Sequence, residues 1–244
     1  MKRWMPVLVF AVTLSLLGAC GQQSTADEEL PKDQAIFTWW GERTTQFPDY
    51  EYSVSDEEEA LNTLTQEVGL QLLPSFDEAR DLIKRDFLIE GTAQEPEEFV
   101  IHSKKYEFHF ASMIKFKTPE GVYLSYGVVN EDYRYIERLG KVKLYKQKIE
   151  VYNATENQTY NGRSLEATLV SLGQLLKLEE PEQLVADFME RTNDPEKLKG
   201  QDVFIYDTLE EAADERLFGI RFGVEYNEEG VLKMIYAYTV DNRI

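Results

Sequence analysis

The chain has 244 residues, of which 43% are hydrophobic and 29% charged, and it contains one cysteine. These proportions are those of a globular protein with a substantial apolar core, and they exclude collagen-like, disulfide-rich and intrinsically disordered classes. The 45 acidic residues outnumber the 26 basic residues, which gives a formal net charge of −19. A nucleic-acid partner is therefore not expected, because binding to phosphates needs clustered lysine and arginine.

The first segment, residues 1–19, has the pattern of a secretory signal peptide. Lys2 and Arg3 supply positive charge, and an uncharged, mostly apolar stretch of 14 residues follows from residue 4 to residue 17. An α-helix needs about 20 apolar residues to span a bilayer. We therefore expect a signal that is removed from the mature protein rather than a membrane span.

The only cysteine follows this segment directly. Leu17-Gly18-Ala19-Cys20 resembles the lipobox of bacterial lipoproteins. The resemblance implies that the sulfur of Cys20 receives a diacylglyceryl group and that cleavage makes Cys20 the first mature residue. Two acyl chains, palmitate among them, give stable anchoring, so the resemblance predicts a lipid-anchored protein on the extracytoplasmic face of a bacterial cell membrane. The alternative is a plain secretory signal followed by a chance cysteine.

Residues 21–33 (GQQSTADEELPKD) are polar and show no apolar periodicity. We expect residues 20–33 to be the lipidated cysteine and a flexible tether. Aromatic residues begin abruptly after this segment, so the folded part is expected to start at residue 34, with a strand or an irregular segment that lies against the core.

Two helices are predicted next. Ser55 and Glu58 have the spacing of a capping box, and apolar residues at helical spacing follow up to Leu72. Ser75 and Glu78 repeat this spacing before a second apolar stripe that ends at Phe87.

From residue 99 onward the pattern becomes that of strands. Apolar residues occupy all the even positions of residues 106–117 except Ser112, a turn follows at 118–121, and residues 122–129 form a partner strand. Residues 141–152 (KVKLYKQKIEVY) predict one or two further strands with a strongly basic outer face. These elements make up a first α+β half, residues 34–153.

A polar break at residues 153–162 separates this half from a second α+β half, residues 154–244. The second half has two predicted helices, a strand at 203–205, a short acidic helix and a hairpin that ends at residue 240. Short matches support a duplication; for example, Glu120-Gly121-Val122 corresponds to Glu229-Gly230-Val231. Chance similarity between two α+β segments is the alternative interpretation.

The sequence thus predicts an α+β fold in which a helix pair is followed by an antiparallel sheet, with this order given twice. Such an arrangement is similar to that of beta-lactamase inhibitor proteins and of some small bacterial lipoproteins. The similarity is one of architecture, no family motif carries it, and an architecture does not supply a function.

Residues with catalytic or metal-binding chemistry do not form a recognisable motif. His102 and His109 are the only histidines, and in a continuous extended chain they would face opposite sides, although Lys104-Lys105 is expected to interrupt the strand. Ser112 and Lys115 have the Ser-x-x-Lys spacing of penicillin-recognising enzymes, but in a strand these positions point to opposite faces. We therefore predict no catalytic residue, no metal and no cofactor.

Two groups of residues are candidates for partner binding. Adjacent tryptophans in an extended chain face opposite ways, so one of a pair can be exposed and anchor a partner; the alternative, which we favour, is that both pack against the sheet. The lysines between residues 141 and 148 form a basic surface suited to polyanions of the envelope. The candidates are Trp39, Trp40, Lys141, Lys143, Lys146 and Lys148.

A clear anchor without a catalytic inventory predicts a membrane-anchored lipoprotein that acts as a non-enzymatic binding or accessory module of the cell envelope. Its expected partners are the membrane, through the lipid anchor, and an unidentified protein or envelope component. Two alternatives remain: an envelope hydrolase with a carboxylate pair, and a small solute-binding lipoprotein. A deep cavity that holds two close acids would favour the hydrolase.

Overall fold

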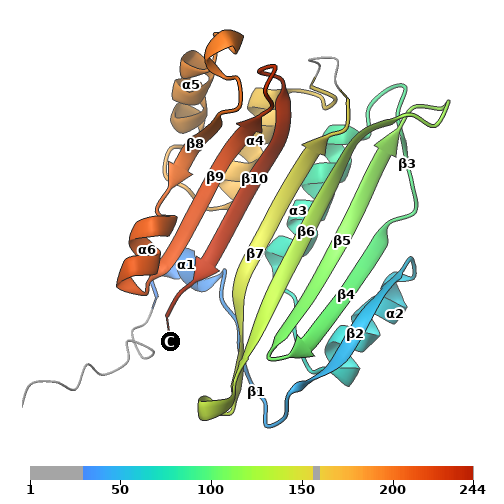
Figure 1. Cartoon of the computed structure of the whole chain (residues 1–244), viewed down its shortest axis with the longest axis vertical. Coiled ribbons are helices and arrows are strands. Elements are labelled where there is room, and N and C mark those ends of the chain that lie inside the picture. The colour runs from blue at the N-terminus through green and yellow to red at the C-terminus, as the bar shows by residue number, and fades with distance from the viewer. Residues whose placement is uncertain (1–29, 156–159, 244) are drawn as a thin grey trace, which may run out of the picture.

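The computed structural model describes residues 30–155 and 160–243. The predicted signal peptide, Cys20 and most of the predicted tether lie outside the described residues. The described chain has an α+β fold in which a single antiparallel sheet is covered by helices on one face (Figure 1). The sheet order is β2-β4-β5-β6-β7-β10-β9-β8, with β1 beside β7 and β3 beside β5.

The elements have the following bounds in chain order. The strands are β1 (Trp40–Glu42), β2 (Phe47–Val54), β3 (Ala93–Gln94), β4 (Glu98–Lys105), β5 (Glu107–Lys117), β6 (Tyr123–Ile136), β7 (Lys141–Asn153), β8 (Asp202–Asp207), β9 (Phe218–Tyr226) and β10 (Leu232–Asp241). The helices are α1 (Lys32–Ala35), α2 (Glu57–Asn62), α3 (Pro74–Phe87), α4 (Leu165–Leu175), α5 (Pro181–Arg191) and α6 (Leu209–Glu215).

The first helical region differs in detail from the sequence prediction. The cap of α2 is Asp56 rather than Ser55, because the Asp56 carboxylate accepts a hydrogen bond of 3.1 Å from the backbone N–H of Glu59. A π-helical turn, Thr63–Glu67, continues α2. At the other end of the expected tether, Lys32 and Asp33 lie in α1.

Helix α3 is fixed to the sheet by an apolar stripe. The ring of Phe76 lies 5.7 Å from that of Phe110, and the ring of Phe87 lies 5.9 Å from that of Phe116. The helix begins at Pro74, which suits a first helical turn. The predicted helix is confirmed, but Ser75 does not cap it, because Ser75 is the second residue of the helix; its hydroxyl donates to Gln147.

Strand β5 shows why the sheet has two different faces. Its side chains alternate, so that Phe108, Phe110, Ile114 and Phe116 are fully buried beneath the helices while the odd positions stay partly exposed. This alternation and the pairing of β5 with β6 confirm the predicted hairpin.

The sheet joins the two expected halves of the chain. Strand β7 pairs along its length with β10, from Met234 opposite Tyr152 to Val240 opposite Lys146. Strand β10 therefore lies between β7 and β9, in the interior of the sheet. The two halves form one sheet rather than two separate sheets.

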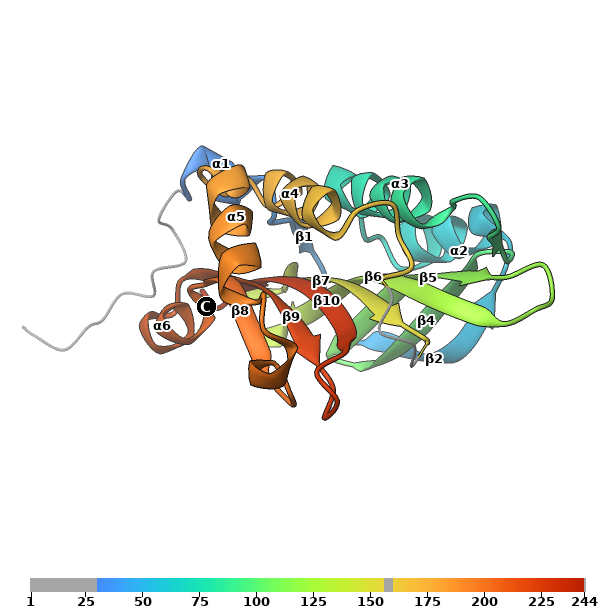
Figure 2. The ribbon, with the colours of Figure 1, turned by 90° about the horizontal axis from the view of Figure 1, so that it is seen from above.

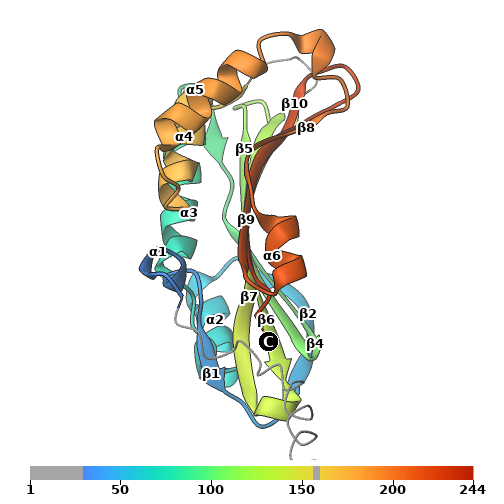
Figure 3. The same ribbon diagram turned by 90° about the vertical axis from the view of Figure 1, so that its left-hand side faces the viewer.

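The helices α2, α3, α4 and α5 lie on the same side of the sheet, as the view along the sheet shows (Figure 2). The opposite side carries only the short helix α6 among the described helices, near one end of β9 (Figure 3). The sheet is curved, and this uncovered side is on the inside of the curve (Figure 3). We call this side the open face and the other side the covered face.

Candidate functional site

The open face is built from alternate residues of the central strands. Because the buried even positions of β5 define the covered face, the strand partners of its odd positions belong to the open face. The register then carries this assignment across β6, β7 and β10. The central open-face residues are Met113, Lys115, Tyr126, Val128, Asn130, Asp132, Lys146, Lys148, Glu150, Tyr152, Tyr236 and Tyr238.

Tyrosines form the apolar part of this face. Tyr126 and Tyr152 stack with their ring centroids 4.5 Å apart, and Tyr236 and Tyr238 stack at 5.0 Å. Glu150 lies between the two stacks and accepts hydrogen bonds from Tyr238 (2.7 Å) and Tyr152 (3.0 Å). Burial and this carboxylate raise the pKa of both phenols. The rings are thus held in fixed positions; Tyr126, Tyr152 and Tyr238 are partly exposed, whereas Tyr236 is buried.

Two lysines lie at the centre of the open face. Lys146 and Lys148 alternate along β7, and Lys148 lies between Asn130 of β6 and Tyr238 of β10. The ammonium group of Lys146 lies 5.0 Å from the ring centroid of Tyr238. Burial, followed by the nearby charge of Lys148, lowers the pKa of Lys146. We call Lys146 and Lys148 the central lysine pair.

Asn130 and Asp132 complete this centre on β6. Asn130 is 8% exposed, and its Oδ1 atom has no hydrogen-bond partner within the described part of the chain. Asp132 lies opposite Lys146 and contacts His109 Nδ1 at 2.6 Å. The centre therefore presents two cationic groups beside an unsatisfied amide.

A buried network lies under this centre on the covered face. Glu131 accepts hydrogen bonds from the backbone N–H of Leu73 (3.1 Å) and the amide of Gln147 (3.0 Å). The Tyr133 hydroxyl contacts both Gln71 O (2.8 Å) and a Glu131 oxygen. A hydroxyl has one proton, so both contacts are satisfied only when Glu131 is protonated and donates to Tyr133.

The burial of Glu131 also favours its protonated form. It raises the pKa of Glu131 to about 7, and the charge of Asp77 acts in the same direction. The network joins the start of α3 to β6 and β7, because Ser75 also contacts Gln147 at 3.2 Å. Its role is to hold the strands, since Glu131 itself is fully buried.

The sequence-predicted lysines do not act together. Lys143 is 1% exposed, and its ammonium group donates to the backbone oxygens of Asp241 (2.7 Å) and Arg243 (2.9 Å). Lys141 is exposed at the far end of β7. Lys143 is therefore unavailable for a partner, and of the four lysines only Lys146 and Lys148 lie at the centre of the open face.

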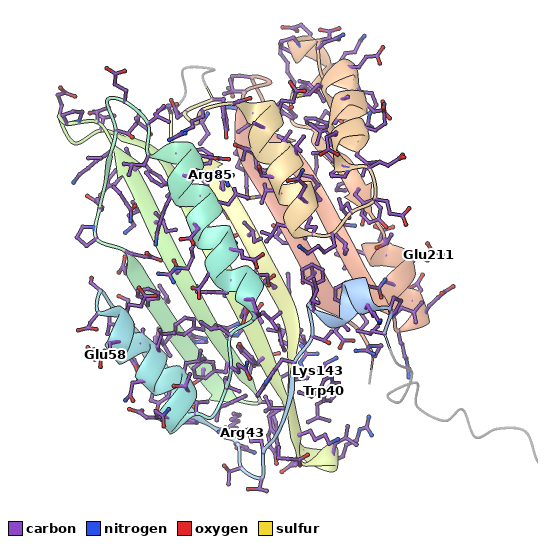
Figure 4. The ribbon with its side chains drawn as sticks, turned by 180° about the vertical axis from the view of Figure 1, so that it is seen from behind. Trp40, Arg43, Glu58, Arg85, Lys143 and Glu211 are labelled. Carbon is purple, nitrogen blue, oxygen red and sulfur yellow. The ribbon has the colours of Figure 1, made fainter. Side chains whose placement is uncertain are left out.

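Trp39 and Trp40 pack on opposite sides of the sheet, and both are partly buried. The ring of Trp39 meets Tyr133 edge-on at 5.9 Å and joins the core. The ring of Trp40 lies 5.4 Å from the Lys143 ammonium group, where β1 runs beside β7 (Figure 4). Neither ring is a freely exposed anchor.

The expected interruption of the strand at Lys104-Lys105 is present, and it brings the two histidines to the same face of the sheet. His102 of β4 lies directly opposite His109 of β5, and their ring centroids are 5.5 Å apart on the open face. The reason is that the chain turns at Lys105 and Tyr106, where Lys105 has a φ of 52°, so the two histidines are not in one continuous strand. Within the described residues, no group of three or more His, Cys, Asp or Glu side chains is placed to hold a metal ion.

The prediction that Ser112 and Lys115 point to opposite faces of the sheet is confirmed. Ser112 is fully buried on the covered face, where its hydroxyl donates to Glu97. Lys115 lies on the opposite face and pairs with Glu98 at 3.0 Å. The lysine cannot activate the serine.

Two cavities lie away from the central lysine pair. One of about 240 Å³ is lined mainly by apolar residues of α5 and the β9–β10 hairpin, among them Met189 and Tyr226. Another of about 170 Å³ borders α6 and includes the exposed Glu211 and Glu215. Neither of these cavities contains a pair of buried carboxylates.

Sequence reasoning missed the tyrosines and Asn130. The alternation of Tyr236 and Tyr238 in β10 is visible in the sequence, but its meaning depends on which face of the sheet the helices leave uncovered. No helix in the described part of the chain is both long and apolar enough to cross a membrane. A scan against protein-family models and searches of curated proteins and of solved structures found no match for this chain.

Proposed function

We propose that this protein is a lipid-anchored, extracytoplasmic binding module that holds a partner on the open face of its sheet. The anchor is the acylated sulfur of Cys20, which the lipobox pattern supports. The partner would be a protein or another component of the cell envelope. The tether between Cys20 and Leu30 spans ten residues, which limits its reach to roughly 35 Å, so the partner would be met close to the lipid surface.

One observation carries the binding function. The helices cover one face of the sheet, whereas the other face presents fixed tyrosine rings around the central lysine pair. Tyrosines that are already ordered lose little conformational freedom on binding, and such residues are frequent in the centres of protein interfaces.

The alternatives receive less support. A hydrolase would need two close carboxylates in a cavity, and the cavities that we describe offer none. A solute-binding lipoprotein is expected to enclose its ligand between two lobes of parallel sheet, whereas the described strand pairs are all antiparallel within one sheet.

We also propose that the two halves arose by duplication. The order of α2, α3 and the strands β4 to β7 is followed in the second half by α4, α5 and the strands β8 to β10. The hairpin turns at Gly121 and Gly230 both use a positive φ, of 91° and 78°. Because β7 and β10 pair directly, two such halves would share one sheet.

The anchor is tested by metabolic labelling with an alkyne analogue of palmitate. We expect the wild-type protein to be labelled and to sediment with membranes, and the Cys20→Ala variant to lose both properties. An unlabelled wild-type protein, or a variant that stays with the membrane, would contradict the anchor.

The binding face is tested by cross-linking in intact cells. A photo-reactive amino acid at Tyr238 or Tyr152 should give discrete, saturable cross-links, whereas the same group at the exposed Glu78 of α3 should not. Cross-links that arise only from Glu78 would show that the partner binds the covered side and would defeat the proposal.

A further inference from the structure

We propose that the partner on the open face is a protein that presents an acidic segment, and that Lys146 and Lys148 receive its carboxylates. This inference rests on the proposed binding function and goes beyond it by naming the chemistry of the partner.

The first observation is that the central lysine pair has no carboxylate of its own. Elsewhere on this face basic groups are paired: Lys115 with Glu98 at 3.0 Å, Arg134 with Glu107 at 3.1 Å and Arg221 with Asp207 at 2.9 Å. Among the described residues, no carboxylate lies within 4.0 Å of the ammonium group of either central lysine.

The nearby carboxylates are already engaged. Asp132 and Glu150 act on Lys146 from a distance, but Asp132 contacts His109, and Glu150 accepts from two tyrosine hydroxyls. Both lysines are partly buried, so a carboxylate that approached them would be less screened by water than at an exposed lysine. Such a carboxylate would also offset the mutual repulsion of the two ammonium groups.

The second observation is the amide of Asn130. Its Oδ1 atom is buried beside Lys148 without a partner in the described chain, and a buried polar atom without a partner is unfavourable. A peptide segment offers backbone N–H donors next to its carboxylates, and rotation of the Asn130 side chain toward the surface would let its Oδ1 atom accept one of them. A phosphate group offers oxygens alone.

The third observation is the contrast with the remainder of the protein. The net charge of −19 repels an acidic partner in general. A local pair of lysines without a direct ion pair, within an acidic molecule, therefore selects the position and orientation of the partner rather than adding nonspecific attraction. The stacked tyrosines on either side would supply the apolar contact.

The inference is tested with the unlipidated chain, residues 20–244 carrying Cys20→Ser. The probe is a short fluorescein-labelled peptide of alternating glutamate and serine, and binding is measured by fluorescence anisotropy at low ionic strength. We expect the double variant Lys146→Met/Lys148→Met to bind about tenfold more weakly, which corresponds to about 1.4 kcal/mol. Amide shifts in the NMR spectrum should be largest near residues 130 and 148.

A matched control is available on the surface. Lys197→Met/Lys199→Met removes the same charge from two lysines whose ion pairs are with Asp194 and Glu196, outside the open face. This control should change affinity less than about twofold, since screening limits charges far from the site. Methionine keeps the aliphatic stem of lysine, and an unchanged melting temperature would show that both double variants fold.

Three outcomes would overturn the inference. The wild-type protein could bind the matching glutamine–serine peptide as tightly as the glutamate–serine peptide, or the control variant could lose as much affinity as the Lys146→Met/Lys148→Met variant. The third outcome is that phosphatidylglycerol vesicles bind through the lysine pair while the acidic peptide does not. Cross-linking distinguishes a failure of this inference from a failure of the proposed binding function. Cross-links from Tyr238 that persist in Lys146→Met/Lys148→Met cells would reject the acidic partner and keep the binding face, whereas loss of all open-face cross-links from wild-type cells would reject the binding face itself.

Discussion

Gln147 donates a hydrogen bond of 3.0 Å to Glu131, its direct partner across β7 and β6. This bond lies on the covered face, whereas the flanking residues Lys146, Lys148 and Asn130 point to the open face. The buried pair therefore sets the spacing of the two strands that carry the centre of the candidate site. Changes to it should reach the open face through the shared backbone.

Glu131→Gln should remove a pH-dependent loss of stability. The pKa of Glu131 is about 7 in the folded protein, above its usual 4.5, so between these values the folded state binds more protons than the unfolded state. The free energy of unfolding should then fall by about 3 kcal/mol as the pH rises from about 4.5 to about 7. Glutamine is neutral and its N–H can donate to Tyr133.

Urea unfolding across this pH range measures the effect. The variant should equal the wild type near pH 4 and exceed it by up to about 3 kcal/mol at pH 8. The exposed Glu137→Gln should show no such difference. A Glu131→Gln variant that is less stable than the wild type at pH 8 would contradict a protonated Glu131.

Lys143→Met should loosen the described C-terminal residues. Burial lowers the pKa of Lys143 to about 8, so above this pH the unfolded state binds the extra proton and stability rises until about pH 10.5. The variant should lose this rise in stability. The backbone amide of Asn242 donates to Leu217 at 3.0 Å. This amide should exchange with deuterium more rapidly in the variant, because Asp241 and Arg243 lose their common donor. The exposed Lys141→Met should change neither property. Unaltered exchange in Lys143→Met would show that Lys143 does not hold the described C-terminal residues in place.

Gly127→Ala should push α3 away from β6. A β-carbon at this position would lie 2.7 Å from the Ile83 side chain, and overpacking of this kind costs about 1–3 kcal/mol. In chemical denaturation, the double variant with Ile83→Ala should be more stable than the sum of the two single losses predicts. Additive losses would show that the clash is relieved elsewhere.

Thr168→Val should weaken the contact between α3 and α4. The Thr168 hydroxyl donates to the buried Asp86 at 2.8 Å and accepts from Tyr160 at 2.8 Å. Valine has nearly the same shape but leaves the Tyr160 hydroxyl without this acceptor and Asp86 Oδ2 without this donor, although Asp86 Oδ1 keeps its ion pair with Arg85; the loss should cost about 1–3 kcal/mol. Thermal unfolding of this variant, compared with the exposed Thr65→Val, measures the loss; equal melting temperatures would argue that Asp86 finds another donor.

Local patterns predicted much of the secondary structure. The alternation in residues 106–117 identified both the strand and its buried positions, because a strand that is covered on one face must alternate. The paired sheet strands beyond residue 217 were likewise recognisable from their turn at Gly230. Such features depend only on neighbours in the sequence.

The candidate site depended on features that neighbours do not determine. The register of β6 and β7 shifts between Asp132 and Tyr133, so Tyr145 is an extra residue and Lys143 shares a face with Lys146 despite an odd spacing. The C-terminal residues then bury Lys143, a contact across about a hundred positions that no local pattern indicates. The interruption of the strand at Lys104-Lys105 was expected, but the register that sets His102 opposite His109 was not.

Strand β10 is the last strand described, yet it occupies an interior position in the sheet. Until residues 232–241 have been synthesised, β7 and β9 both have an unpaired edge, and the sheet remains in two parts. Unpaired edges invite association between chains. Products truncated before residue 232 should therefore aggregate or be degraded during biogenesis, and the sheet should acquire its native structure only after β10 has been inserted.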